Sequence, residues 1–206
     1  MSPTSANFQR YGGYLGNTGR LPEAIEQLKR ALDLDPLWLK AHQDLGLWYW
    51  WDNRHEEAVR QLHKALDLDP HYAAARWTLG GTYLEQRLYN EAIAEFQAAR
   101  ESAAGDPLYL TGLAYANAIV GKKHKALSLL REMEDLSRRQ YVSPVFFAWV
   151  HIALEQNDQA MECLEKAYEE RAPLLPCACS FPWFDPLRSD PRFRDLLKRM
   201  KLPLKP

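Results

Sequence analysis

The chain has 206 residues, of which 47% are hydrophobic and 26% are charged, as in an ordinary folded protein. Its formal net charge is −1, because Lys+Arg 26 are balanced by Asp+Glu 27. This balance argues against a protein that grips nucleic-acid phosphates, which needs a basic excess. An aromatic content of 12% argues against intrinsic disorder.

The N-terminus and the cysteines give no sign of export or membrane insertion. Residues 1–10 lack the apolar core of a signal peptide. No stretch reaches the roughly 18 apolar residues that a membrane-spanning helix needs. Three cysteines are too few for a disulfide-built scaffold. We therefore expect a cytoplasmic protein without a nucleic-acid or membrane partner.

A period of 34 residues runs along the chain. The segment RALDLDP at 30–36 returns as KALDLDP at 64–70. One alanine position persists over five steps of this period, at Ala24, Ala58, Ala92, Ala126 and Ala160. A fixed period of this length is typical of stacked repeat proteins.

Within each repeat the pattern predicts two helices, A and B, joined by a tight turn. Ala58, Leu62 and Ala65 fall on one face of a helix with 3.6 residues per turn. Small residues at such positions allow two helix backbones to approach closely where they cross. A single hairpin cannot bury its own apolar face, so neighbouring hairpins must stack.

The ends of the predicted helices carry their own signals. A glycine or asparagine that suits a left-handed conformation closes helix A at Gly19, Asn53 and Gly121. Helix B ends before Pro36 and Pro70, because the residue preceding a proline avoids helical angles.

After Ala172 the composition of the chain changes, and repeated prolines predict loops and short turns. Ser189 or Asp190 then begins a last helix as its N-cap, with Pro191 at the first helical position. Residues 177–200 are expected to cap the last repeat, with Trp183 and Phe184 as its plug. This end carries seven basic against two acidic side chains, a charge typical of a solvated face, with an acidic partner as the alternative.

The motifs inside the period resemble those of the tetratricopeptide repeat. Residues 39–72 carry Leu45, Gly46, Tyr49 and Ala58 at the family's positions, although His42 stands where the family has tryptophan. The resemblance divides the chain into a leader at 1–4, five repeats and a tail at 175–206. The repeats are 5–38, 39–72, 73–106, 107–140 and 141–174. The tail sequence from Trp183 to Phe193 also resembles the end of repeat regions that follow other domains in bacterial multidomain regulators.

The resemblance implies an all-α fold, a right-handed α-solenoid of five helix-turn-helix repeats plus a C-terminal capping helix. It also implies a concave groove, lined by the A helices, that binds a protein or peptide partner. The groove residues that we predict are Lys40, Gln43, Leu47, Trp50, Trp51, Trp77, Gly81, Leu84, Thr111, Tyr115 and Trp149.

The predicted groove offers aromatic side chains and little charge. The cation pair with which a well-known subset of the family clamps a peptide carboxylate is absent, because Gln43 and Leu47 occupy such positions. We expect apolar or aromatic anchors in the ligand, with open space for one of them beside Gly81. The alternative is that Trp50 and Trp149 only fill gaps between successive A helices, and Trp48 is expected in the core.

The N-terminal edge has no predicted cap, and its first helix carries Gly12, Gly13 and Gly16. Two explanations are open: the repeats follow another domain in a longer protein, or another molecule covers the edge. The second explanation gives an alternative function, self-assembly into a homo-oligomer or scaffold through this edge.

Catalytic chemistry has no signature in the sequence. We expect no enzyme activity, no cofactor, and neither catalytic nor metal-binding residues. His151 and Glu155 share a helix face and are read as a packed or solvent-facing pair. Cys163, Cys177 and Cys179 leave a metal or redox role open, although structural zinc usually needs four ligands.

Overall fold

The computed structural model describes residues 4–203, and every regular element in this range is a helix. The chain divides into two compact units, Met1–Ser102 (unit 1) and Ala103–Pro206 (unit 2). Most of the predicted leader at 1–4 and the last three residues of the tail lie outside the described residues. Within residues 4–203, no helix is both long enough and apolar enough to cross a membrane.

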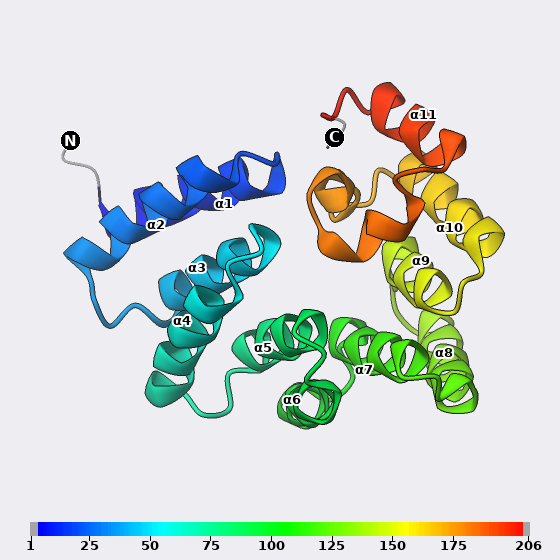
Figure 1. Cartoon of the computed structure of the whole chain (residues 1–206), viewed down its shortest axis with the longest axis horizontal. Coiled ribbons are helices and arrows are strands. Elements are labelled where there is room, and N and C mark those ends of the chain that lie inside the picture. The colour runs from blue at the N-terminus through cyan, green and yellow to red at the C-terminus, as the bar shows by residue number, and fades with distance from the viewer. Residues whose placement is uncertain (1–3, 204–206) are drawn as a thin grey trace. The chain divides into compact units, whose positions relative to one another are not determined.

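Unit 1 consists of three helical hairpins (Figure 1). The two helices of each hairpin pack on each other, and helices α3 and α5 also contact the hairpin before them. The helices are α1 (Ser5–Asn17), α2 (Leu21–Leu34), α3 (Leu39–Trp51), α4 (His55–Leu68), α5 (Ala73–Glu85) and α6 (Tyr89–Ser102).

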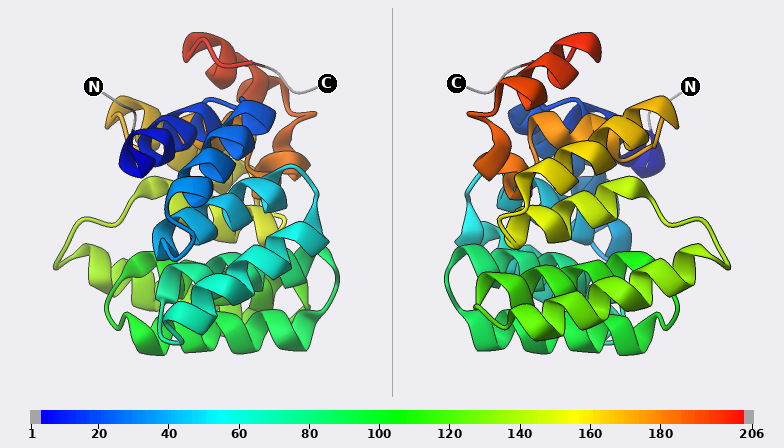
Figure 2. Two further views of the ribbon diagram at one scale, coloured as in Figure 1. Left: turned by 90° about the vertical axis from the view of Figure 1, so that its left-hand side faces the viewer. Right: turned by 90° about the vertical axis from the view of Figure 1, so that its right-hand side faces the viewer.

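Unit 2 consists of two hairpins and a C-terminal segment. This segment, drawn orange to red in Figure 2, forms short turns and then one regular helix. The second short turn packs on α9, and the last helix packs on α10. The elements are α7 (Pro107–Ile119), α8 (Lys123–Ser137), α9 (Pro144–Ala153), α10 (Asn157–Glu169), η1 (Leu175–Cys179), η2 (Pro182–Leu187) and α11 (Pro191–Arg199).

The turn between the helices of a hairpin repeats with the period of the sequence. A residue with positive φ stands at Gly19, Asn53, Arg87, Gly121 and Glu155, each 34 residues after the last. Each is followed by an amide that donates to the carbonyl oxygen five residues earlier, as from Arg54 N to Tyr49 O at 2.8 Å and from Leu88 N to Tyr83 O at 2.9 Å. The prediction for Gly19, Asn53 and Gly121 is confirmed, and the register places Arg87 and Glu155 in the same conformation.

The other predicted helix ends are also confirmed. Helices α2 and α4 end at Leu34 and Leu68, and Asp35 and Asp69 follow as C-caps before the prolines. Asp190 is the N-cap of α11, and its carboxylate accepts a hydrogen bond of 2.8 Å from the amide of Arg192.

Small residues lie where the helices of a hairpin cross. The alanines of the five-step series have no exposed surface. A side chain added at Gly46 would reach to 2.6 Å from Leu62, and one at Gly80 to 3.0 Å from Phe96. These crossings bury the apolar faces inside each hairpin, while contacts between successive hairpins of the same unit bury further apolar surface. The fold class is an all-α solenoid, as predicted.

Polar side chains join the two helices of a hairpin at the position where the family has tryptophan. His42 Nε2–H donates to the Pro36 carbonyl at 2.8 Å, and its Nδ1 lies 2.8 Å from Gln61 Oε1. One period later, Arg76 bonds the Pro70 carbonyl and Glu95 in the same way. The departure from the family pattern therefore replaces an aromatic contact with a polar bridge from helix A to helix B.

Candidate partner-binding surfaces

In unit 1, the predicted groove tryptophans take part in packing. Trp50 has 0% exposed surface, and its ring meets the Trp77 ring edge on, with centroids 5.7 Å apart. A side chain added at Gly81 would collide with the Trp50 ring. The expectation of open space beside Gly81 is therefore wrong, because Trp50 occupies that space. Trp50 packs from α3 onto α5, which is the packing alternative raised by the sequence.

Other predicted groove residues of unit 1 differ in accessibility. Lys40 is exposed, and its ammonium pairs with the buried carboxylate of Asp44 at 3.0 Å. Gln43 is buried and donates to the Thr78 hydroxyl at 3.3 Å. Leu47 is half-buried. Trp51, Trp77 and Leu84 are buried but not fully. Lys40 and Leu47 are thus the predicted groove residues of unit 1 with the largest accessible side chains.

In unit 2, the chain itself covers the predicted groove residues. The Trp183 ring stacks on the Tyr115 ring, with centroids 3.8 Å apart and planes at 6°. Trp149 meets Phe181 and Trp183 edge on, at 4.8 Å and 5.5 Å. All five rings of this cluster, which includes Phe184, are buried. The plug residues Trp183 and Phe184 therefore lie on the face predicted to receive a ligand.

The remaining predicted groove residue of unit 2, Thr111, is hydrogen-bonded to the backbone of its own helix. It is buried, and its hydroxyl donates to the Pro107 carbonyl at 2.7 Å. Among the residues expected in the core, Trp48 is buried, and its ring covers Gly16 so closely that an added side chain would collide with it. The prediction for Trp48 is confirmed, and Gly16 is explained by the same contact.

The basic side chains of the last helix, α11, are exposed, and two of them form ion pairs with α10. Arg192 pairs with Asp158 at 2.8 Å, and Arg199 pairs with Glu165, so both arginines tie α11 to α10. Arg199 also lies over the Tyr168 ring at 4.8 Å. Both arginines remain exposed, as expected of a solvated face, and partly exposed ion pairs each contribute only about 0–1 kcal/mol.

The cysteines do not form a ligand set. Among residues 4–203, no three His, Cys, Asp or Glu side chains come together in a way that could hold a metal ion. Burial raises the pKa of the Cys163 thiol to about 11 and also raises the pKa of Cys177. Both thiols are therefore protonated and weakly reactive at neutral pH. His151 hydrogen-bonds Gln156 at 2.8 Å, which gives it a packing role.

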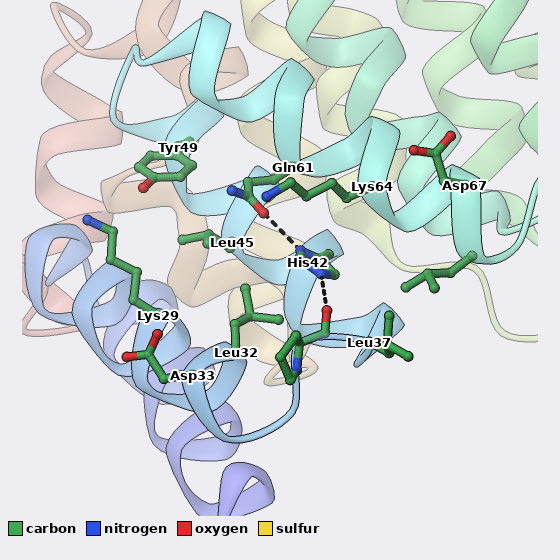
Figure 3. A pocket seen from close by; sticks show the side chains of 12 residues that line it. Lys29, Leu32, Asp33, Leu37, His42, Leu45, Tyr49, Gln61, Lys64 and Asp67 are labelled. Carbon is green, nitrogen blue, oxygen red and sulfur yellow. Dashed lines mark hydrogen bonds between the residues drawn. The ribbon is translucent and has the colours of Figure 1, made fainter.

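A cleft of about 500 Å³ opens in unit 1 between α2 and α4, with α3 as its floor (Figure 3). The His42 bridge to Gln61 and Pro36 forms part of its wall. Leu32 and Leu45 contribute apolar surface, while Lys29 and Lys64 reach in from the two flanking helices. This cleft is made of side chains that the groove prediction did not include.

The stacked hairpins define a helical repeat protein, and comparison with known families identifies the type of repeat. Residues 49–114 and residues 145–172 match two family models, each described as tetratricopeptide repeat. Both matched segments are therefore tetratricopeptide repeats. Comparison with curated proteins finds no match.

Solved structures share the fold at low sequence identity. TTC0263 from Thermus thermophilus, a thermophilic repeat protein of this family, is 18% identical, with a TM-score of 0.70, covering 97% of this chain and 100% of that one. MamA from Desulfovibrio magneticus RS-1 is 18% identical, with a TM-score of 0.56, covering 84% and 98%. YrrB, described as having an unusual peptide-binding site, is 20% identical, with a TM-score of 0.52, covering 84% and 89%.

Proposed function

We propose that this chain is a non-enzymatic, cytoplasmic module that binds a segment of a partner protein through the A helices of unit 1. The ligand contributes apolar or aromatic anchors, and its terminal carboxylate is not clamped. The proposal keeps the division into five repeats, from 5–38 to 141–174, because it rests on equivalent positions in successive repeats.

The observation that carries the proposal is the stack of Trp183 on Tyr115. Tyr115 and Trp149 are each the ninth residue of their repeat, a position that contacts ligands in the resembled family. In unit 2 these residues do hold an aromatic segment that is not part of a repeat, but it belongs to the same chain. The ninth position in this protein is therefore suited to aromatic and proline-rich segments.

Unit 1 offers the same position to a partner. Its ninth residues are Gly13, Leu47 and Gly81. Since glycine has no side chain, Leu47 alone of these three offers one, and it is half-buried. Lys40 lies on the same helix at the exposed surface, so a ligand over Leu47 has a polar neighbour at one side. The description of YrrB as a peptide-binding protein of similar fold supports a peptide ligand in general terms.

A synthetic peptide of residues 180–187, which has the sequence SFPWFDPL, tests this proposal. Labelled with a fluorophore and titrated with the full chain, it should bind saturably. Leu47→Glu should weaken this binding about tenfold or more, since one buried leucine contact is worth about 1.5–3 kcal/mol. Leu127→Glu, at an exposed leucine of α8 in unit 2, is the matched control and should leave binding unchanged. Absence of binding, or an equal effect of both variants, contradicts the proposal.

A second candidate function, self-association through the N-terminal edge, has an observation in its favour. Tyr11 and Tyr14 on α1 are 48% and 62% exposed, and a side chain added at Gly13 would touch nothing within 4 Å. Two periods later, Gly81 at the equivalent position is covered by Trp50 from the preceding hairpin. We propose that a second copy of the chain supplies the corresponding cover for Gly13.

Light scattering of the full chain tests the second candidate. An oligomer that dissociates in the Tyr11→Ser/Tyr14→Ser variant, but persists in the Tyr141→Ser control, supports it. Tyr141 is similarly exposed in unit 2. A monomer at every concentration up to the solubility limit excludes it.

A further inference from the structure

The cleft between α2 and α4 has one end that is rich in hydrogen-bond donors. In Figure 3 the ammonium groups of Lys29 and Lys64 extend toward this end, where the Tyr49 hydroxyl and the Gln61 amide also lie. Both lysines are exposed, and within residues 4–203 neither forms an ion pair. Two ammonium groups without a carboxylate partner favour an anionic group at this end.

The rest of the cleft combines leucine side chains with polar ones, since Asp33, Asp67 and His42 also line it. Leu32 and Leu45 lie between the two lysines and the loop that follows α2. At the rim, Leu37 is 73% exposed, and Leu68 at the end of α4 is also exposed. Leucine side chains left in water around a concavity mark a place where an apolar side chain gains by binding.

The acidic groups of the cleft limit what can bind there. Asp33 and Asp67 stand on the same two helices as the lysines, each one turn nearer the helix C-terminus. They oppose a ligand with a long run of negative charge. A ligand that carries one or two carboxylates next to an apolar side chain satisfies the lysines and the leucines without facing both aspartates.

We propose that this cleft is a second binding site, which takes a short peptide segment of a partner protein with a leucine-like side chain flanked by a carboxylate. The apolar side chain lies over Leu32 and Leu45, and Lys29 and Lys64 bind the carboxylate. The site lies on the B-helix side of the hairpins, so it goes beyond the proposed function and does not depend on it. A partner that uses both sites would contact A and B helices of the same unit.

The test uses a fluorescent peptide with the sequence acetyl-Gly-Glu-Leu-Leu-Glu-Gly-amide as the probe. It should bind the full chain, and binding should weaken as salt is added. Removal of both ammonium groups, in Lys29→Ala/Lys64→Ala, should weaken binding about fivefold, as expected for two exposed ion pairs. Charge reversal in Lys29→Glu/Lys64→Glu should abolish it.

The controls distinguish binding at this cleft from nonspecific electrostatic attraction and from binding at the A-helix surface. Lys123→Glu/Lys125→Glu on α8 changes the net charge by the same amount and should leave binding unchanged. A peptide with serine in place of both leucines should not bind, and Leu47→Glu should have no effect on the original probe. The inference is overturned if the probe does not bind, if both charge-reversal variants lose binding equally, or if the serine peptide binds equally well. Circular dichroism checks that each variant is folded.

Discussion

Units 1 and 2 use the same positions of the repeat in different ways. In unit 2 the ninth residues of the repeats are aromatic, and the C-terminal segment lies against them, with Trp183 stacked on Tyr115. In unit 1 the ninth residues are Gly13, Leu47 and Gly81, and Gly81 is covered by a tryptophan from the preceding helix pair, whereas Gly13 has open space. An aromatic side chain at a ligand-contacting position can therefore be covered within the chain, so that side-chain type alone does not identify the free surface.

The largest expected effects on stability come from the tryptophans that cover ninth residues of the repeats. Trp183→Ala in unit 2 and Trp50→Ala in unit 1 should each lower the free energy of unfolding by about 3–5 kcal/mol, because both side chains have no exposed surface. Urea denaturation measures this loss. Tyr14→Ala, at an exposed ring of α1, should change stability by no more than about 0.5 kcal/mol. A small loss for either tryptophan would show that it lies on an open surface.

A matched pair of glycine variants distinguishes a covered position from an open one. Gly81→Ala should destabilise the protein by about 1–3 kcal/mol, because the new methyl group meets the immobile ring of Trp50. Gly13→Ala, at the equivalent position of the first repeat, has open space within a single chain and should stabilise α1 of the monomer by about 0.5–1 kcal/mol. Thermal unfolding followed by circular dichroism gives both values. Destabilisation by both variants would contradict the assignment of Gly13 as uncovered, and stabilisation by both would contradict the assignment of Gly81 as covered.

The cap of unit 2 depends on the start of its last helix. Asp190→Ala should cost about 1 kcal/mol, because the carboxylate that accepts from the Arg192 amide is lost. Asp190→Asn is the control and should keep most of the stability. The hydrogen bond from the Arg192 side chain lowers the pKa of Asp190 below its ordinary value of 3.8. The ionised Asp190 carboxylate therefore contributes to the free energy of unfolding above pH 3.8, and this contribution is lost as the pH falls through the lowered pKa. The stabilities of wild type and Asp190→Ala should therefore become equal in acid.

The smallest effect concerns a turn that both units share. Arg87→Gly should stabilise the protein by about 0.5–1 kcal/mol, because Arg87 has a φ of 61° that glycine adopts without strain. The same substitution in the middle of α4, Arg60→Gly, should instead destabilise by about 1 kcal/mol. Chemical denaturation of the two variants decides the point, and destabilisation by Arg87→Gly would show that its side chain contributes more than the strain costs.

The sequence predicted the fold well because its main determinants are local and periodic. The alanine series, the prolines after Asp35 and Asp69, and the turn residues all act within one repeat. The turn geometry at Arg87 and Glu155 could also have been predicted, since both lie in register with Gly19 and Asn53. Residue type alone conceals it, because arginine and glutamate are uncommon in the left-handed region.

The candidate site was less predictable because it depends on contacts between distant segments. Trp183 and Tyr115 are two periods apart, and no spacing rule places an aperiodic, proline-rich segment on a particular helix. The cover of Gly81 by Trp50 depends on the direction of one ring. The cleft formed by Lys29 and Lys64 needs the distance between two B helices, which the repeat pattern does not contain.

Hydrogen exchange with the bound peptide of residues 180–187 distinguishes a ligand site on unit 1 from one on unit 2. If unit 1 receives the partner while unit 2 is covered by its own segment, the peptide should slow exchange in α3, around Leu47, and leave α7 and α9 unchanged. Slower or altered exchange in α7 and α9 without protection of α3 would contradict the account. That result would mean that the peptide replaces the chain's own segment on Tyr115 and Trp149.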